Sequence, residues 1–369
     1  MYSIKINCFT IIFALIFLSI LYGAQLFVIW TNQTILMEEI TSILYCFPLI
    51  IIFSFIVLIL ISMKISDFLY STILLIFGLF LGYLLYIFQI SIIIKILLVF
   101  YSPPEYISLI LLYLIPLIIC IYGIINALVT KIIRIKLKYP GFKGKCTILH
   151  LSDIHLGAIH QRGSVAKIVK EIQNLEDDID IIVITGDMAD GSLKVKSSWL
   201  SPFDLLEIPI LYITGNHEQF NPKNDMINQV QMTNIKYLGN LGNFVHKGVN
   251  FIGADFECNL QNCFETADIK QDMPNVFLYH VPEIGPEDLK EHNIFLFLAG
   301  HTHGGQLFPL NLLAYCANKC FKGLYSDQDK MHHVFVSEGV NNAVVPMRIG
   351  SSRVFAIITI EGENDKQFS

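Results

Sequence analysis

Five short motifs that carry metal-ligating side chains occur in order along the second half of the chain. Carboxylate, amide and imidazole groups dominate them, and no cysteine lies among them. This donor set suits Mn²⁺, Fe or Zn²⁺ and suits Mg²⁺ less well. The sequence therefore predicts a site for divalent metal ions, built from Asp153-Ile-His155, Gly186-Asp187-Met-Ala-Asp190, Gly215-Asn216-His217-Glu218, His280, and Gly300-His301-Thr-His303.

Taken singly, most of these motifs have an ordinary explanation. Asp-x-His is common by chance, Gly-Asn-His can be a turn, and His280 alone could be a hydrogen-bonded core histidine. Gly300-His301-Thr-His303 is more specific, because side chains two residues apart on an extended segment point to the same side. The prediction rests on the ordered set of five.

Short apolar runs precede the motifs and predict buried strands. A helix is predicted over residues 164–175, since its apolar residues fall on one face. Alternating strands and helices indicate an α/β layered sandwich. In such folds ligands bind at the carboxyl ends of the strands, where all five motifs would lie. The expected strands cover residues 147–151, 180–184, 208–214, 249–254, 276–280 and 295–298.

The first third of the chain is strongly apolar and predicts membrane helices. A helix needs about 20 apolar residues to cross a bilayer. Residues 1–130 are therefore predicted to form a multi-pass membrane region of about four helices. The segment 91–101 carries Lys95 and could be an interfacial helix or an extension of the third span. The candidate spans are residues 8–30, 44–63, 68–90 and 106–128.

The distribution of charge predicts the orientation and the partners. Residues 131–145 hold six basic residues and no acid, and are expected to be a basic juxtamembrane linker. The loop at residues 31–42 holds Glu38 and Glu39 and no basic residue. Because basic loops stay in the cytoplasm, the domain at residues 146–369 is predicted to be cytoplasmic, with Lys5 and Lys64 on the same side. That domain has 16 basic and 27 acidic residues, a difference of −11, which disfavours nucleic acid as a partner.

The cysteines leave the compartment partly open. Five of the eight lie in the predicted soluble domain, and an odd number cannot pair off completely. Reduced thiols in a cytosolic domain are the favoured interpretation. The close pairs Cys258/Cys263 and Cys316/Cys320 keep a lumenal, disulfide-bonded alternative open.

Residues 146–361 resemble the calcineurin-like metallophosphoesterase superfamily. Within it, four segments are similar to a membrane-associated or secreted bacterial-type branch that includes a UDP-diacylglucosamine pyrophosphatase. The resemblance implies a four-layer α/β sandwich, in which two mixed sheets are flanked by helices. The four segments are Ser152-Asp-Ile-His-Leu-Gly157, Gly300-His-Thr-His-Gly-Gly-Gln306, Gly323-Leu-Tyr325 and Pro346-Met-Arg348.

The resemblance also implies a role for each motif residue. Asp153, His155 and His303 would hold one divalent metal, and Asn216, His280 and His301 would hold the second. Asp187 would bridge the two ions, which together activate a hydroxide and offset charge in the transition state. His217 would donate a proton to the leaving group or stabilise the equatorial oxygens, and Asp190 would hydrogen-bond His217, orient it and keep it cationic.

The predicted function is metal-dependent hydrolysis of a phosphomonoester, phosphodiester or pyrophosphate. Because a tethered site sees substrates of its own membrane at high effective concentration, a lipid-linked phosphate is favoured over a soluble one. Two alternatives remain: a membrane scaffold or receptor that uses the fold for ligand binding, and a transporter with a regulatory hydrolase domain. The sequence specifies neither the substrate nor the oligomeric state.

Several polar residues near the motifs have two interpretations each. Glu218 either supports the site or is a solvated charge, and Asp255 is either a site acid or surface decoration. Arg348 and Arg353 are expected to form structural salt bridges rather than to bind substrate phosphate. Surface positions are expected for five other histidines, His160, His246, His292, His332 and His333.

Overall fold

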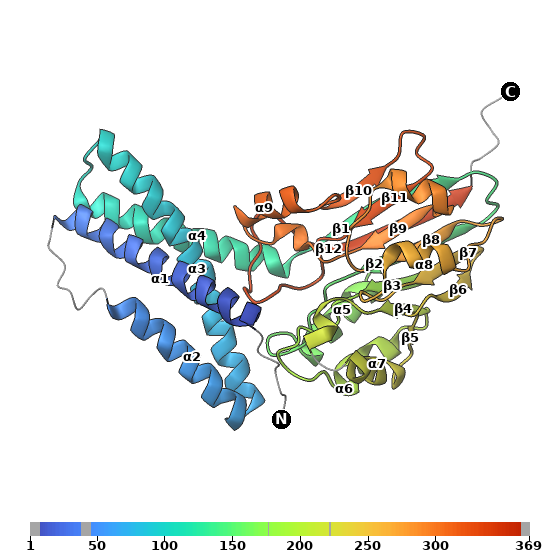
Figure 1. Cartoon of the computed structure of the whole chain (residues 1–369), viewed down its shortest axis with the longest axis horizontal. Helices are drawn as coiled ribbons and strands as arrows, with labels where there is room; N and C mark the ends of the chain where they lie inside the picture. The colour runs from blue at the N-terminus through green and yellow to red at the C-terminus, as the bar shows by residue number, and fades with distance from the viewer. Residues whose placement is uncertain (1–7, 38–45, 176, 221–222, 363–369) are drawn as a thin grey trace. The chain divides into compact units, whose positions relative to one another are not determined.

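The computed structural model describes residues 8–37, 46–175, 177–220 and 223–362 (Figure 1). The chain divides into two compact units. The first comprises Met1–Ile124 with Val344–Pro346, and the second comprises Ile125–Ala343 with Met347–Ser369.

Four apolar helices account for the described part of the N-terminal region. All four are long and apolar enough to cross a membrane. The third continues through residues 91–100, so the interpretation of that segment as an extension of the third span is confirmed. Lys5, Glu38 and Glu39 lie outside the described residues. The helices are α1 (Cys8–Leu36), α2 (Phe47–Ile65), α3 (Asp67–Phe100) and α4 (Glu105–Leu128).

The charge of Lys95 is accommodated near the end of α3. Its ammonium group contacts the hydroxyl of Thr34 and lies 3.4 Å from the centre of the Trp30 ring. Thr34 and Trp30 belong to the last turns of α1. A cation over an aromatic face next to a hydroxyl is stabilised without a carboxylate partner. The charge of Lys95 is therefore no argument for a transport pathway through these helices.

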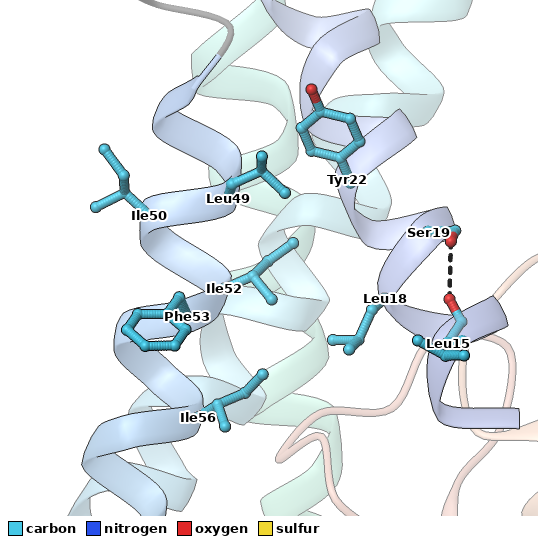
Figure 2. A pocket seen from close by; sticks show the side chains of 9 residues that line it. All are labelled: Leu15, Leu18, Ser19, Tyr22, Leu49, Ile50, Ile52, Phe53 and Ile56. Atoms are coloured by element: carbon cyan, nitrogen blue, oxygen red, sulfur yellow. Dashed lines mark hydrogen bonds between the residues drawn. The ribbon is translucent and has the colours of Figure 1, made fainter. Parts of the chain in front are cut away.

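An apolar pocket of about 590 Å³ lies between α1 and α2 (Figure 2). Leu18, Ile52 and Phe53 are among its lining residues. The hydroxyl of Ser19 donates to the carbonyl of Leu15 in its own helix at 2.8 Å, so it leaves the lining apolar. Such a surface suits contact with lipid chains better than contact with water.

The second unit is built on two six-stranded mixed sheets. The first has the order β1-β12-β2-β3-β4-β5, and the second has the order β10-β11-β9-β8-β7-β6. The strands are β1 (Thr130–Tyr139), β2 (Lys145–Leu151), β3 (Ile181–Thr185), β4 (Ile210–Ile213), β5 (Ile235–Tyr237), β6 (Gly242–His246), β7 (Val249–Gly253), β8 (Asn275–Leu278), β9 (Leu296–Ala299), β10 (Gly323–Ser326), β11 (His333–Val336) and β12 (Arg353–Gly362).

Helices cover the outer faces of both sheets, so the predicted sandwich of two mixed sheets flanked by helices is confirmed. They are α5 (Arg162–Gln173), α6 (Ser197–Leu200), α7 (Lys223–Gln231) and α8 (Leu260–Thr266). A further helix, α9 (Leu310–Ala317), follows the loop of His303 and has no buried residue. Alternate residues of each strand face opposite layers. Leu149 and Ile182 pack toward α5, Ile148 and Val183 pack between the sheets, and Phe277 packs toward α8.

The segment predicted as a basic linker is largely a strand. β1 runs parallel to β12, with Thr130 beside Arg353 and Tyr139 beside Gly362. Its apolar side chains Ile133, Ile135 and Leu137 join the core between the sheets, while its basic residues alternate with them. β1 is an edge strand, and charged side chains on an edge discourage pairing with other chains. The positive charges therefore also have a structural role.

Candidate metal centre

The five motifs all follow the carboxyl ends of strands. Three come after β2, β3 and β4 of the first sheet, and two come after β8 and β9 of the second. Their backbones are unusual, because five non-glycine residues in them adopt positive φ. Such conformations cost free energy and are typical of functional sites. The residues are Asp153 (+56°), His155 (+48°), Asp187 (+51°), His301 (+71°) and His303 (+51°).

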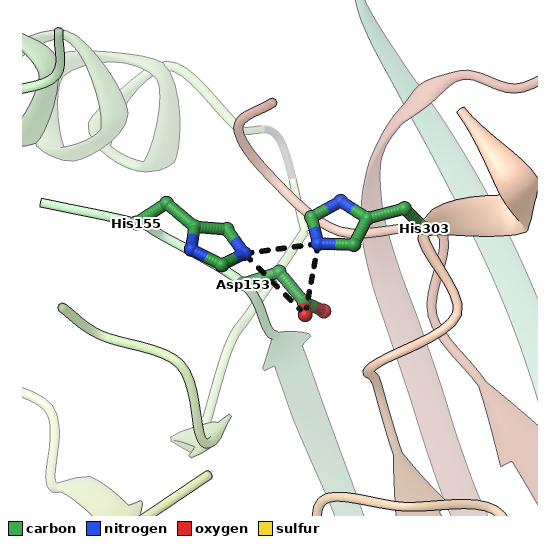
Figure 3. A group of neighbouring side chains, drawn as sticks. All are labelled: Asp153, His155 and His303. Atoms are coloured by element: carbon green, nitrogen blue, oxygen red, sulfur yellow. Dashed lines mark hydrogen bonds and ion pairs between the residues drawn. The ribbon is translucent and has the colours of Figure 1, made fainter. Parts of the chain in front are cut away.

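The first group of donors consists of Asp153, His155 and His303 (Figure 3). The Nε2 atoms of the two imidazoles are 2.9 Å apart, and Asp153 Oδ1 lies 3.4 Å from Nε2 of His303. All three side chains are buried. Burial holds the pKa of both histidines well below its ordinary value, so both rings are neutral and can offer a lone pair.

The second group consists of Asp187, Asn216, His280 and His301. Asn216 Oδ1 lies 3.0 Å from Nε2 of His280 and 2.8 Å from Nδ1 of His301. Nδ1 of His280 meets the carbonyl oxygen of Thr185 at 2.8 Å, which directs Nε2 toward Asp187 at 3.1 Å. Four donors from four different loops therefore converge.

Asp187 lies between the two groups. Its Oδ2 is 3.1 Å from Nε2 of His280 and 3.8 Å from Nε2 of His155. Burial alone would raise the pKa of this carboxyl, but His280, His155 and His217 outweigh burial and lower it. A carboxylate within reach of both groups has the position expected of a bridging ligand.

The donor set fits divalent cations. Within each of the triads Asp153/His155/His303 and Asp187/His280/His301, the candidate ligand atoms lie within 4.8 Å of one another. Oxygen and neutral imidazole donors are the ligands preferred by Mn²⁺, Fe and Zn²⁺. The buried Asp187 carboxylate raises the pKa of His280 to about 9, and a bound cation would replace the proton that this ring carries.

His217 lies beside both groups and forms a third triad of candidate ligands with His155 and Asp187. Its Nε2 is 4.0 Å from Asp187 Oδ2, and its main-chain N–H donates to Asp187 Oδ1 at 2.9 Å. The ring is partly exposed, with 24% of the side chain accessible, and it packs edge-on to Phe220. This arrangement leaves Nε2 available to a molecule entering from solvent.

Asp190 contacts His217 through its main chain and not through its carboxylate. The partner of His217 Nδ1 is the main-chain carbonyl oxygen of Asp190, at 3.1 Å. The carboxylate of Asp190 instead accepts hydrogen bonds from the N–H and hydroxyl of Ser192, at 2.7 and 2.6 Å. Burial raises the pKa of Asp190, although the Ser192 bonds oppose this.

Glu218 is buried behind the site, so it supports the site and is not a solvated charge. Its carboxylate accepts the main-chain N–H groups of Asp187 at 3.1 Å, Ala189 at 2.8 Å and Gly215 at 2.6 Å. It therefore ties the loop of Asp187 to the loop of Asn216. Burial and the nearby Asp187 raise the pKa of Glu218 to about 7.

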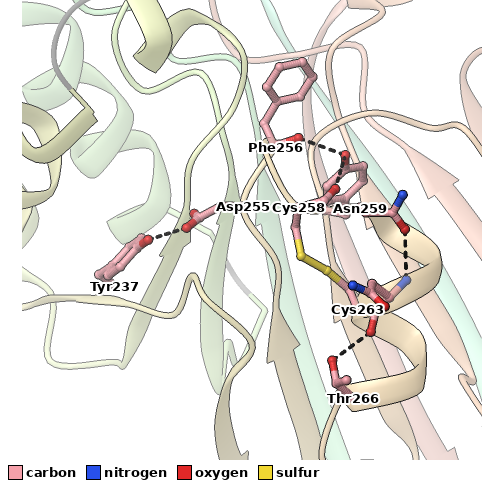
Figure 4. The surroundings of a disulfide bond; sticks show 9 residues. Tyr237, Asp255, Phe256, Cys258, Asn259, Cys263 and Thr266 are labelled. Carbon is pink, nitrogen blue, oxygen red and sulfur yellow. Dashed lines mark hydrogen bonds between the residues drawn. A yellow bond between two sulfur atoms is a disulfide. The ribbon is translucent and has the colours of Figure 1, made fainter.

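Asp255 is also buried and supports the site (Figure 4). It accepts from the hydroxyl of Thr214 at 2.7 Å and from the hydroxyl of Tyr237. Thr214 directly precedes the Gly215-Asn216 loop.

Nearby, Cys258 and Cys263 are joined by a disulfide, so the expectation of reduced thiols is wrong for this pair in the structure. Cys316 and Cys320 are free.

The two arginines and His333 occupy structural positions. Arg353 pairs with Glu171, as expected. Arg348 is completely buried and donates to main-chain carbonyls, including that of His303 at 3.3 Å, so a structural role is confirmed but not the salt bridge. The prediction of a surface position is wrong for His333, which is buried against Phe295 and hydrogen-bonded to Ser326.

Comparison with known proteins supports this description of the domain. Residues 146–305 match the family model of the calcineurin-like phosphoesterases. An uncharacterized metallophosphoesterase of Helicobacter pylori is 30% identical over 59% of this chain and 60% of that protein. A bovine transmembrane protein with metallophosphoesterase domain is 31% identical over 58% of this chain and 52% of its own length.

Among solved structures, the yellow lupin purple acid phosphatase PPD1 is similar at a TM-score of 0.33 and 14% identity, over 63% of this chain and 47% of that one. That degree of similarity adds nothing to the topology above. The chain spans little more than half of the length of the curated relatives it matches. The ordered motifs, the two-sheet sandwich and the family match together identify residues 146–305 as a calcineurin-like metallophosphoesterase domain.

Proposed function

We propose that this chain is a membrane-anchored phosphoesterase that uses two divalent metal ions to hydrolyse a phosphomonoester, phosphodiester or pyrophosphate bond. The observation that carries the proposal is the position of Asp187 between two groups of donors, 3.1 Å from His280 and 3.8 Å from His155. When bound, the two ions would supply Lewis-acid stabilisation of the phosphoryl oxygens and an activated water.

The proposed ligands come from both sheets. One ion would be held by Asp153, His155 and His303, and the other by Asn216, His280 and His301, with Asp187 shared. Glu218 and Asp255 would fix the loops that carry Asp187 and Asn216, through the hydrogen bonds described above. This rigid support keeps the ligands in place in the absence of substrate, which limits reorganisation during the reaction.

His217 would act on the leaving group. Its Nδ1–H donates to the main-chain carbonyl of Asp190, which leaves Nε2 directed toward the site. When protonated, Nε2 could transfer its proton to the departing oxygen, and a positioned acid of this kind contributes about 10²–10⁴ in rate. Asp190 would orient His217 through the main chain, and would hold the loop through Ser192.

The substrate is proposed to be carried by the membrane. Four helices of the chain are apolar enough to span a bilayer, and a site tethered there meets lipid-linked phosphates at high effective concentration. The direct experiment is a screen of the full-length protein in lipid vesicles, with Mn²⁺, against model phosphomonoesters, phosphodiesters and lipid pyrophosphates. Hydrolysis that stops on addition of a chelator is expected, and the absence of turnover with every class would refute the proposal.

The catalytic domain is proposed to face the cytoplasm. Lys64 and the basic residues of 131–145 support this side. The Cys258–Cys263 disulfide weighs against it, because disulfides persist mainly in oxidising compartments. In a cytosolic domain these two thiols should be reduced, which makes their oxidation state in cells a direct test of the orientation.

A further inference from the structure

An exposed apolar surface lies just after the last candidate metal ligand. It consists of Phe308 and four residues of α9, and we call it the α9 patch. No residue of α9 is buried, although seven of the eight residues in its sequence LNLLAYCA are apolar. The accessible fractions are 47% for Phe308, 44% for Leu310, 57% for Leu312, 69% for Leu313 and 64% for Tyr315.

The orientation of α9 is the reverse of that in a soluble amphipathic helix. Its one polar residue within the helix, Asn311, packs against the domain. A Cβ atom added at Gly305 would lie 2.2 Å from Asn311 Cα, and one added at Gly350 would lie 2.4 Å from Asn311 Nδ2. Helices at a water-facing surface normally turn apolar residues inward and polar residues outward. A contiguous apolar face turned outward indicates a surface that binds something apolar.

We infer that the α9 patch is a membrane-contact surface that inserts into the headgroup region of a lipid bilayer. The chain itself supplies the reason to choose a bilayer over a protein, because its four apolar helices keep the domain next to one. Lys319 and Lys322 follow α9; they pair with Asp288 and Glu338, and 54% and 36% of their side chains remain accessible. Apolar and aromatic residues bordered by lysines are typical of helices that lie in the membrane interface.

The α9 patch is fixed to the candidate metal centre. The loop from His303 leads directly into α9, and the main-chain N–H of Phe308 donates to the carbonyl of Ile349 at 2.9 Å. Gly305 permits the close packing of this loop against Asn311. A bilayer that holds α9 would therefore also hold the loop of His303 at a fixed distance from the lipid headgroups.

The test measures the depth of α9 directly and does not depend on catalysis. Cys316 is an exposed free thiol within α9, and an environment-sensitive fluorophore can be attached to it in full-length protein with Cys8→Ser and Cys46→Ser. The protein is placed in vesicles of neutral and anionic lipids, a fraction of which carry a nitroxide on the acyl chain. A matched control carries the same probe at Met232→Cys with Cys316→Ser, because Met232 is 70% exposed elsewhere on the domain.

The nitroxide lipids should quench the probe at Cys316 at least about twofold more than the probe at position 232. Iodide in solution should quench the probe at Cys316 less than the probe at position 232. Leu312→Glu with Leu313→Glu should abolish that difference, whereas Met232→Glu should not. Equal quenching at both positions would overturn the inference. Protection from iodide without quenching by nitroxide lipids would assign the α9 patch to a protein partner and would equally overturn it. Loss of activity on every substrate would refute the proposed function but leave this result unchanged.

Discussion

The contact between Asp190 and His217 leads to a prediction that separates two roles for Asp190. If its carboxylate oriented His217, Asp190→Asn would disable the proton donor. In the structure the main-chain carbonyl makes this contact, at 3.1 Å from Nδ1, and a change of side chain leaves the carbonyl in place. We therefore expect Asp190→Asn to lower kcat by less than about tenfold, while His217→Ala lowers it by about 10²–10⁴.

The magnitude for stability follows from the two Ser192 hydrogen bonds. A bond to a charged group contributes about 1.5–3 kcal/mol, and a neutral one about 0.5–1.5 kcal/mol. Asp190→Asn would keep a side-chain oxygen that accepts both bonds as neutral ones, so the loss should be about 2–3 kcal/mol. Asp190→Ala would remove both bonds, at 2.7 and 2.6 Å, and should cost about 3 kcal/mol or more.

The assay compares kcat and urea unfolding for both Asp190 variants and His217→Ala. The structure predicts that activity follows stability in the Asp190 pair, with the alanine variant worse in both. An asparagine variant that unfolds like the wild type yet loses as much kcat as His217→Ala would refute the reasoning, because only a direct electrostatic role of the carboxylate could then explain the loss.

Three further predictions concern His217, His150 and the disulfide. His217→Ala should retain both metals, and its kcat should fall less for nitrophenol esters than for poor leaving groups; an equal loss for both would exclude the general-acid role. His150 is buried in β2, with Nε2 2.8 Å from the Thr185 hydroxyl. Burial lowers the pKa of His150 to about 3, so the unfolded chain binds an extra proton below about pH 6.5 and stability is lost as pH falls. Between pH 7.5 and 5 this histidine should account for about 2 kcal/mol, and His150→Gln should remove that part of the acid destabilisation in urea unfolding; unchanged pH dependence would contradict it. If the domain is cytosolic, Cys258 and Cys263 should react with a thiol reagent in cells, and protease added to intact cells should spare the C-terminus; cleavage there or a persistent disulfide would place the domain on the other side.

The sequence was sufficient to predict the strands that end at the candidate site. β3, β4, β8 and β9 are largely apolar runs, as parallel strands buried on both faces require, and the apolar run of β2 is interrupted by Thr147 and His150. The motif residues could be assigned to one site because strand ends converge in this class of fold. Their ligand roles remain predictions.

Other features depend on contacts between distant residues. The alternation of Lys or Arg with Ile or Leu from Thr130 to Tyr139 is a strand pattern, but its partner β12 is more than 200 residues away. The burial of His333 likewise depends on the pairing of β11 with β9. No sequence pattern shows whether Asp190 presents its carboxylate or its carbonyl to His217, since that depends on the turn at Ser192.

The metal content of the purified protein tests the two-metal proposal most directly. Wild-type full-length protein and Asp187→Asn should be loaded with Mn²⁺, freed of excess metal and analysed for ions per chain alongside turnover. Two ions per wild-type chain are expected, and the variant should lose at least one ion and nearly all activity, because both groups of donors depend on the Asp187 carboxylate. Two ions per chain and intact turnover in Asp187→Asn, or no stoichiometric metal in the wild type, would contradict the proposal.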